Sequence, residues 1–144
     1  MLKIDKFTFE NKKLREQAFT IRHNVFVIGQ NCPKHLEYEN EESSTHFLLT
    51  FNGKAVATAR HRKTKLGYKL ERFAVLEKER GKGYGHEILK EILRDLVNFQ
   101  GTIYMHAQVD VLPFYEKLGF KKIGNIFEEA NIKHYKMILD KTKH

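Results

Sequence analysis

The sequence is poor in cysteine and proline and contains no tryptophan. Its single cysteine, Cys32, excludes a disulfide within the chain and fits a reducing compartment. No apolar run approaches the roughly 18 residues that a membrane-spanning helix needs. Residues 1–6 lack the long apolar core of a signal peptide. We therefore expect a cytoplasmic protein that has no membrane partner.

Acidic residues are also scarce relative to basic ones, so the formal net charge is +8. This charge favours a polyanionic partner, either a nucleic acid or a phosphorylated co-substrate. The densest basic cluster is residues 60–65, and the other lysines are scattered. Because no nucleic-acid-binding motif is visible, we interpret most of these charges as solvated surface and expect no nucleic-acid partner. A DNA-binding protein is the weakest hypothesis, and it predicts salt-sensitive binding.

The chain of 144 residues suits one core, and we expect residues 1–144 to form a single domain. Its composition, 41% hydrophobic and 31% charged, excludes a disordered or membrane-embedded chain. The long aperiodic segment 29–44 is typical of a functional loop rather than a linker.

Apolar periodicity and turn residues predict an α/β fold with helices on the faces of a sheet. The dipeptide Asn52-Gly53 is a strong hairpin signal, because both residues accept a positive φ. The amphipathic stretch 88–97 predicts a long helix, and a shorter helix is expected over 111–118. The spacing also predicts a helix over 14–26. The expected strands cover residues 2–9, 45–51, 55–62, 68–75, 102–107, 120–127 and 134–139.

The most informative segment is the run Arg80-Gly81-Lys82-Gly83-Tyr84-Gly85, between an expected strand and the long helix. Alternate glycines allow a tight turn and a close approach of the backbone to a ligand. Unpaired N–H groups at the following helix N-terminus favour an anion, and Arg80 and Lys82 add positive charge. The run predicts a pyrophosphate cradle, and the alternative is a glycine-rich turn without a ligand.

Two common phosphate-binding motifs do not fit this run. The Walker A pattern requires Ser or Thr after Gly-Lys, but Gly83 follows Lys82. The dinucleotide pattern G-x-G-x-x-G would need its third glycine at His86 or Ile88. The pattern that fits is R-x-x-G-x-G, which resembles the acetyl-CoA pyrophosphate loop of the GNAT acetyltransferase superfamily.

A second segment carries the same resemblance. The run Phe114-Tyr115-Glu116-Lys117-Leu118-Gly119-Phe120 is similar to the F-Y-x-x-x-G-F stretch of the superfamily. The order of the expected elements looks like the GNAT fold over nearly the whole chain. That resemblance implies a mixed, mostly antiparallel central sheet flanked by helices. The N-terminal half resembles the ElaA/YjcF-like branch through Val25-Phe26-Val27, Gln30, Glu37, Glu39, Glu42, His46 and Ala57-Thr58-Ala59-Arg60.

The resemblance also implies how the chain would hold acetyl-CoA. Residues 80–85 would bind the pyrophosphate through backbone amides. The backbone of Phe73-Ala74-Val75 would run beside the pantetheine arm, with an amide near Val75 polarising the thioester carbonyl. Gln108 stands where the family often has Asn and is a further candidate for binding the pantetheine.

Acetyl transfer to an amine also needs an acid for the leaving thiolate and a base for the amine. Tyr115 is the candidate acid, because a phenol with an ordinary pKa of about 10 is neutral at pH 7; the alternative is aromatic packing beside Phe114. Glu71 is the candidate base, since strand alternation puts it on one face with Phe73. A salt bridge is the equally weighted alternative. Asp110 and His106 are secondary candidates, because histidine suits a proton relay.

Other chemistries fit poorly. Lys90 stands where a zinc-protease helix beginning at His86-Glu87 would need its second histidine, and no G-x-S-x-G motif exists. We expect no metal, and we interpret Cys32 as a structural or incidental thiol.

We therefore expect direct transfer from acetyl-CoA to a primary amine of a small molecule, such as an amino sugar phosphate or a polyamine. The alternative is a non-catalytic module that binds acyl-CoA as a sensor. The sequence leaves open whether the protein is a homodimer.

Overall fold

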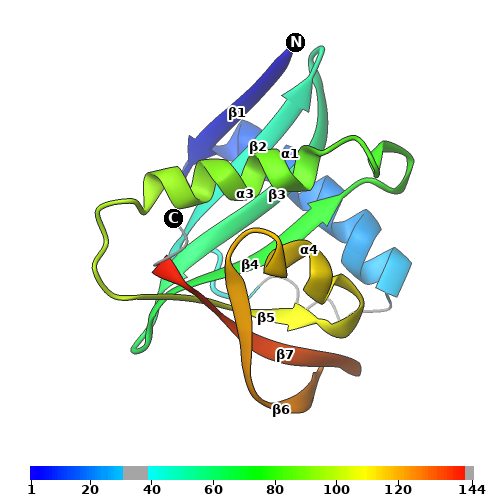
Figure 1. The fold of residues 1–144 in the computed structure, drawn as a ribbon. Helices are drawn as coiled ribbons and strands as arrows, with labels where there is room; N and C mark the ends of the chain where they lie inside the picture. The colour runs from blue at the N-terminus through cyan, green and yellow to red at the C-terminus, as the bar shows by residue number, and fades with distance from the viewer. Residues whose placement is uncertain (31–38, 142–144) are drawn as a thin grey trace. The chain divides into compact units, whose positions relative to one another are not determined.

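The computed structural model describes residues 1–30 and 39–141. These residues form a mixed sheet of seven strands flanked by helices (Figure 1). The chain divides into two compact units, of which the first comprises Met1–Arg62 and Arg72–Phe99. The second comprises Lys63–Glu71 and Gln100–His144. Within the described ranges, no helix is both long enough and apolar enough to cross a bilayer.

In the first unit, consecutive strands pair in antiparallel fashion. Strand β1 (Leu2–Phe7) pairs with β2 (Ser44–Phe51), and β2 pairs with β3 (Lys54–Lys63). The turn between β2 and β3 is Asn52-Gly53, with φ angles of 51° and 83°. Both angles are positive, so the predicted hairpin and its physical reason are confirmed.

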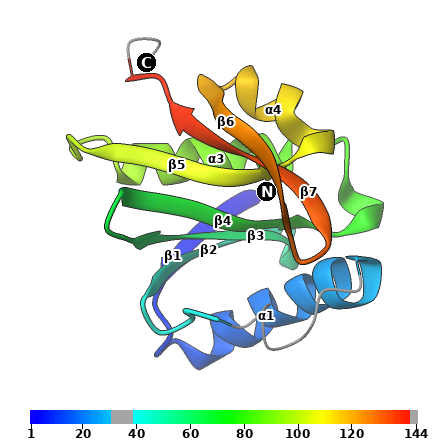
Figure 2. The same ribbon diagram turned by 90° about the horizontal axis from the view of Figure 1, so that it is seen from below.

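Two helices cover opposite faces of β2 and β3 (Figures 1 and 2). Helix α1 (Lys12–Arg22) begins where the side chain of Asn11 accepts a hydrogen bond from the Leu14 amide at 3.1 Å. Helix α3 (Tyr84–Asp95) lies on the other face and buries Ile88, Leu89 and Ile92. The predicted apolar stripe is confirmed at these positions, but the helix ends at Asp95, and Val97 at the end of the predicted stretch is exposed.

The second unit is built on the C-terminal strands. The first half of β4 (Gly67–Val75) runs parallel to β5 (Thr102–Gln108). Strand β7 (Ile132–Leu139) pairs in antiparallel fashion with both β5 and β6 (Phe120–Glu129). Two short helices, η3 (Val109–Val111) and α4 (Leu112–Glu116), connect β5 to β6.

The predicted strands and helices are confirmed with small shifts at their ends, but two local features differ from the expected pattern. Beyond Arg22, the first helix continues as the π-helix η1 (His23–Ile28) rather than as an α-helix. Within β4, Arg72 adopts a left-handed φ of 60°, although it has a Cβ. Strict alternation therefore does not continue through Arg72, so alternation alone no longer supports the prediction that Glu71 and Phe73 share a face.

Gly67 allows a test of the close pairing between β4 and β5 in the second unit. Its φ is 144°, and a Cβ at this position would lie 2.0 Å from the Thr102 carbonyl oxygen, where β4 and β5 pair. We expect Gly67→Ala to lower the free energy of unfolding by about 3 kcal/mol in urea titrations, because backbone rather than a flexible side chain must move.

Gly53→Ala is the matched control. Gly53 also has a positive φ, but a Cβ at this position would meet nothing within 4 Å, so only backbone strain of about 1 kcal/mol is expected. Equal losses in the two variants would contradict the close contact at Gly67.

Candidate functional site

The glycine run forms a tight loop in the first unit. It follows the short helix η2 (Glu77–Glu79) and leads directly into α3. Gly81 and Gly83 have φ angles of 80° and 85°, a region that residues with a Cβ seldom adopt. Gly85 already lies within α3, so the left-handed backbone explains a glycine at positions 81 and 83 but not at position 85.

Gly83 is the N-cap residue of α3, and no side chain caps the helix. The first N–H groups of an α-helix have no partner within the helix, and the helix dipole is positive at this end. A polar N-cap side chain would occupy one of these donors. Without such a side chain, the donors suit the oxygens of a phosphate or pyrophosphate.

The two basic side chains of the loop have different roles in the structure. Arg80 donates from Nε to the Val75 carbonyl oxygen at 3.1 Å, which ties the loop to the end of β4. Lys82 donates from Nζ to Glu79 at 2.9 Å, and Lys54 contacts the second oxygen of the same carboxylate at 3.2 Å. The hydrogen bond from Lys82 is the main cause that lowers the pKa of Glu79.

The predicted pantetheine-binding segment, Phe73-Ala74-Val75, is the end of β4 in the same unit. Ala74 is buried, whereas Phe73 and Val75 are half-buried. The left-handed Arg72 precedes this segment, and its guanidinium lies 5.8 Å above the Phe26 ring. The structure therefore brings two predicted donor-binding segments together, residues 73–75 and 80–85, through the contact between Arg80 and Val75.

Three other predicted residues belong to the second unit: Tyr115, Gln108 and Glu71. Tyr115 is buried on α4 and packs edge to face with Phe114 at 5.1 Å between ring centroids. Burial raises the pKa of the Tyr115 phenol, so it stays protonated at neutral pH. The predicted aromatic packing is confirmed, and it is compatible with an acid role. Gln108 ends β5, opposite His134 of β7.

Glu71 forms an ion pair with Lys69, with 3.4 Å between Oε1 and Nζ. The two side chains are only 13% and 12% exposed. The salt bridge that the sequence left as an alternative is therefore present. Of the two secondary candidates, Asp110 is exposed, and His106 contacts Glu129.

The first unit also holds a buried charge cluster that the sequence analysis missed. Glu41 accepts hydrogen bonds from Arg22 and from Arg60, the latter at 2.6 Å, through its Oε1 atom. Both arginine side chains are 1% exposed and the Glu41 side chain is 7% exposed. Arg60 is thus an exception to the prediction that most of the basic side chains are solvated. The available signal was Arg22, the one polar residue in the apolar stripe of the first helix.

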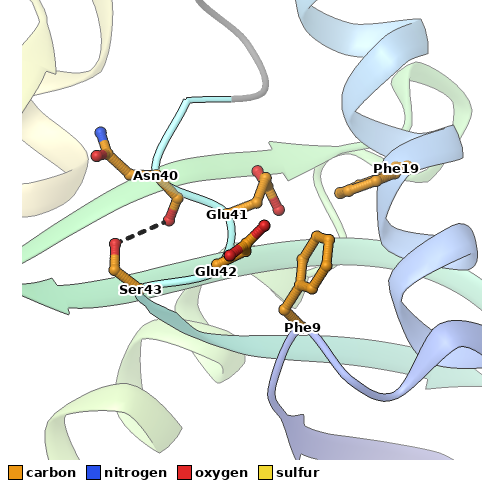
Figure 3. Close-up of a pocket in the computed structure, with 6 residues that line it drawn as sticks. All are labelled: Phe9, Phe19, Asn40, Glu41, Glu42 and Ser43. Carbon is orange, nitrogen blue, oxygen red and sulfur yellow. Dashed lines mark hydrogen bonds between the residues drawn. The ribbon is translucent and has the colours of Figure 1, made fainter.

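Beside this cluster lies an open hollow with a volume of about 500 Å³ (Figure 3). Its lining residues are Phe9, Phe19, Asn40, Glu41, Glu42 and Ser43. Of the two carboxylates in this lining, that of Glu41 is buried and paired with two guanidinium groups, whereas Glu42 is exposed. The predicted loop 29–44 contributes residues 40–43, and its segment 31–38, with Cys32 and Glu37, lies outside the described residues.

Comparison with known proteins identifies the family of the chain. A family model described as an acetyltransferase (GNAT) domain matches residues 10–141. The chain belongs to the GNAT acetyltransferase family. Over 134 residues this GNAT chain is 31% identical to the uncharacterized N-acetyltransferase YjcF of Bacillus subtilis, an overlap of 91% of the chain and 96% of YjcF. Protein ElaA of Escherichia coli is 28% identical over 125 residues, 81% of each sequence.

Solved structures show the same fold. The crystal structure of Escherichia coli ElaA matches with a TM-score of 0.86 at 24% identity, over 96% of this GNAT chain and 99% of that one. An aminoglycoside 6'-N-acetyltransferase complexed with coenzyme A matches with a TM-score of 0.75 at 17% identity, over 94% and 95%. The predicted GNAT fold and the resemblance to the ElaA/YjcF-like branch are confirmed.

The buried cluster predicts a large effect of Glu41 on stability. Glu41→Ala removes the carboxylate and leaves two guanidinium groups buried without it, so we expect a loss of about 3 kcal/mol or more in denaturant titrations. Glu42→Ala is the control, because Glu42 is exposed and its loss should change stability by less than about 0.5 kcal/mol. Similar losses from both variants would be evidence against the cluster.

His46 predicts how stability depends on pH. Burial lowers the pKa of His46 below its usual 6.5, although Nε2 donates to the Glu41 carbonyl at 3.1 Å. The unfolded chain therefore takes up a proton at His46 before the folded chain does. The stabilisation is complete above pH 6.5 and declines as the pH falls below that value. In denaturation at pH 7.5 and 5.5, His46→Gln should show a smaller decline than the wild type; an unchanged decline contradicts this assignment.

Proposed function

We propose that the protein is an N-acetyltransferase that moves the acetyl group of acetyl-CoA directly to a primary amine of a small molecule. The observation that carries this proposal is the loop of residues 80–85. In this loop Gly81 and Gly83 have a left-handed backbone, and Gly83 precedes the first turn of α3 without a side-chain cap. The loop belongs to a chain of the GNAT family. This geometry supports binding of the pyrophosphate of coenzyme A.

Donor binding is assigned residue by residue. Arg80, Gly81, Lys82, Gly83, Tyr84 and Gly85 would bind the pyrophosphate, mainly through backbone amides. Phe73, Ala74 and Val75 would lie along the pantetheine, and Gln108 would hydrogen-bond to it. The similarity to an aminoglycoside acetyltransferase complexed with coenzyme A supports coenzyme A as the ligand class.

Tyr115 is proposed as the general acid. The C–S bond of the thioester breaks after the amine nitrogen has attacked the carbonyl carbon, and the departing sulfur then needs a proton. The buried phenol keeps its proton at neutral pH and can donate it to the sulfur. Glu71 is proposed to take the proton that the nitrogen loses after attack. Glu71 then passes this proton to Tyr115, which restores the phenol for the next turnover.

The acceptor is proposed to be a small primary amine, with amino sugar phosphates and polyamines as the first classes to test. An amine of this kind is a nucleophile only when it is uncharged, so the site must also remove a proton before attack. We propose that the protein acts in the cytoplasm as one acetyltransferase domain without a metal.

Tyr115→Phe and Glu71→Gln test the assigned roles. We expect each to lower kcat by about 10²-fold with little change in KM for acetyl-CoA, because each removes a proton-transfer group and keeps the side-chain shape. The measurement is thiol release from acetyl-CoA with a panel of primary amines. Tyr135→Phe, on β7 of the same unit, is the control and should leave kcat unchanged.

The outcomes separate two functions. Transfer that is unaffected in both variants would overturn the assigned roles. Binding of acetyl-CoA without amine-dependent thiol release would instead favour a sensor that binds acyl-CoA without catalysis.

A further inference from the structure

Titratable side chains gather on one face of the second unit. In the parallel pairing of β4 and β5, Lys69 lies opposite Tyr104. Glu71 and His106 each follow two residues later, so alternation puts all four side chains on the same face. Across β5 and β7, His106 is opposite Lys136. This polar face carries both a predicted base, Glu71, and a histidine that the proposed acetyl transfer does not use.

His106 is held by a carboxylate from β6. Its Nδ1 lies 3.1 Å from the Glu129 Oε2 atom. The hydrogen bond to His106 is the main cause that lowers the pKa of Glu129, so this carboxyl is ionised at neutral pH. An ionised carboxylate only accepts hydrogen bonds, so a neutral imidazole must carry its proton on Nδ1. Nε2 is then left with a lone pair.

Packing fixes the orientation of the imidazole without burying it. The Phe127 ring meets it edge to face, with 5.0 Å between centroids, and the Tyr104 ring lies at 6.0 Å. The His106 side chain is 25% exposed. Within the described residues, Nε2 has no hydrogen-bond partner. The ring therefore presents its basic nitrogen toward solvent or a bound molecule.

Charged and titratable groups from every neighbouring strand face this imidazole. They are Lys69 and Glu71 of β4, Tyr104 of β5, Glu129 of β6, and His134 and Lys136 of β7. Lys69 acts on the Glu129 carboxylate, which places it near the pair. The carboxylates of Glu71 and Glu129 are matched by the ammonium groups of Lys69 and Lys136, so the neutral form of His106 adds no charge to this face.

Overall proton balance requires a base of this kind. An alkyl ammonium ion and a thioester give an amide, a thiol and one proton, so the nitrogen loses two protons in all. One of these ends on the sulfur, through Glu71 and Tyr115 in the proposed mechanism. The other leaves the ammonium before attack and must reach solvent.

We propose that His106 Nε2 accepts this first proton from the acceptor ammonium and passes it to water, with Glu129 as the positioning residue. The N–H bond of the ammonium breaks, the Nε2–H bond forms, and the resulting imidazolium returns its proton to solvent before the next turnover. This inference rests on the proposed acetyltransferase function.

The pH dependence of kcat/KM with a primary amine tests the proposal. We expect His106→Gln to lower kcat/KM by about 10²-fold at pH 7. The deficit should shrink as the pH rises toward 9.5, because an amine that is already uncharged needs no base. Glu129→Gln should produce a smaller deficit with the same pH dependence. A purely structural role predicts a deficit of equal size at every pH, which would overturn the proposal, as would no deficit at all.

Two matched controls are available. Glu128 neighbours Glu129 on β6 but points to the opposite face by alternation, so Glu128→Gln should leave the pH profile unchanged. His61 in the first unit also pairs with a carboxylate, that of Asp95, at 2.9 Å. His61→Gln should lower stability without the pH-dependent loss.

A readout that does not depend on activity separates this inference from the proposed function. ¹⁵N chemical shifts of the histidine rings report which nitrogen carries the proton. The inference requires that the neutral ring of His106 carries its proton on Nδ1 in the wild type. In Glu129→Gln the neutral ring should change toward the Nε2–H form. A wild-type Nε2–H form would overturn the inference even if the acetyltransferase activity is present. A wild type that transfers to no amine would overturn both.

Discussion

The left-handed backbone at Gly83 is the constraint on which the proposed donor site depends. Because this residue caps α3 without a side chain, the first amides of the helix are available to an anion. Arg80 fixes the loop to the end of β4 through the Val75 carbonyl, so the anion site and the end of the strand are held together. The buried residues Ile88, Leu89 and Ile92 keep α3 packed on its face of β2 and β3.

A second constraint is electrostatic and lies inside the first unit. Arg22, Glu41 and Arg60 are buried together, and a buried ion pair contributes little net stability but is costly to break. We infer that the cluster fixes the position of the chain at Glu41, since this residue lies just before β2. His46 extends the cluster through its hydrogen bond to the Glu41 carbonyl.

Local patterns made most of the fold predictable from the sequence. Alternating residues, the Asn52-Gly53 turn and the apolar stripe of α3 are set by neighbours in the chain, so they indicated the strands, the hairpin and the helix. The π-helix after Arg22 and the left-handed φ of Arg72 depart from the regular periodicity on which the sequence analysis relied. The burial of Arg60 depends on its contact with Glu41, 19 positions away in the chain. The contact of His106 with Glu129 is of the same kind, because it joins residues 23 positions apart. The roles of Tyr115 and Glu71 stay predictions.

Calorimetric titration with coenzyme A and with pantetheine tests the central claim most directly. The two ligands share the thiol arm, but pantetheine lacks the pyrophosphate that the start of α3 is proposed to hold. The account predicts saturable binding of coenzyme A and an affinity for pantetheine weaker by about tenfold or more, equivalent to at least about 1.4 kcal/mol. Equal affinities for the two ligands, or no binding of coenzyme A, would contradict it.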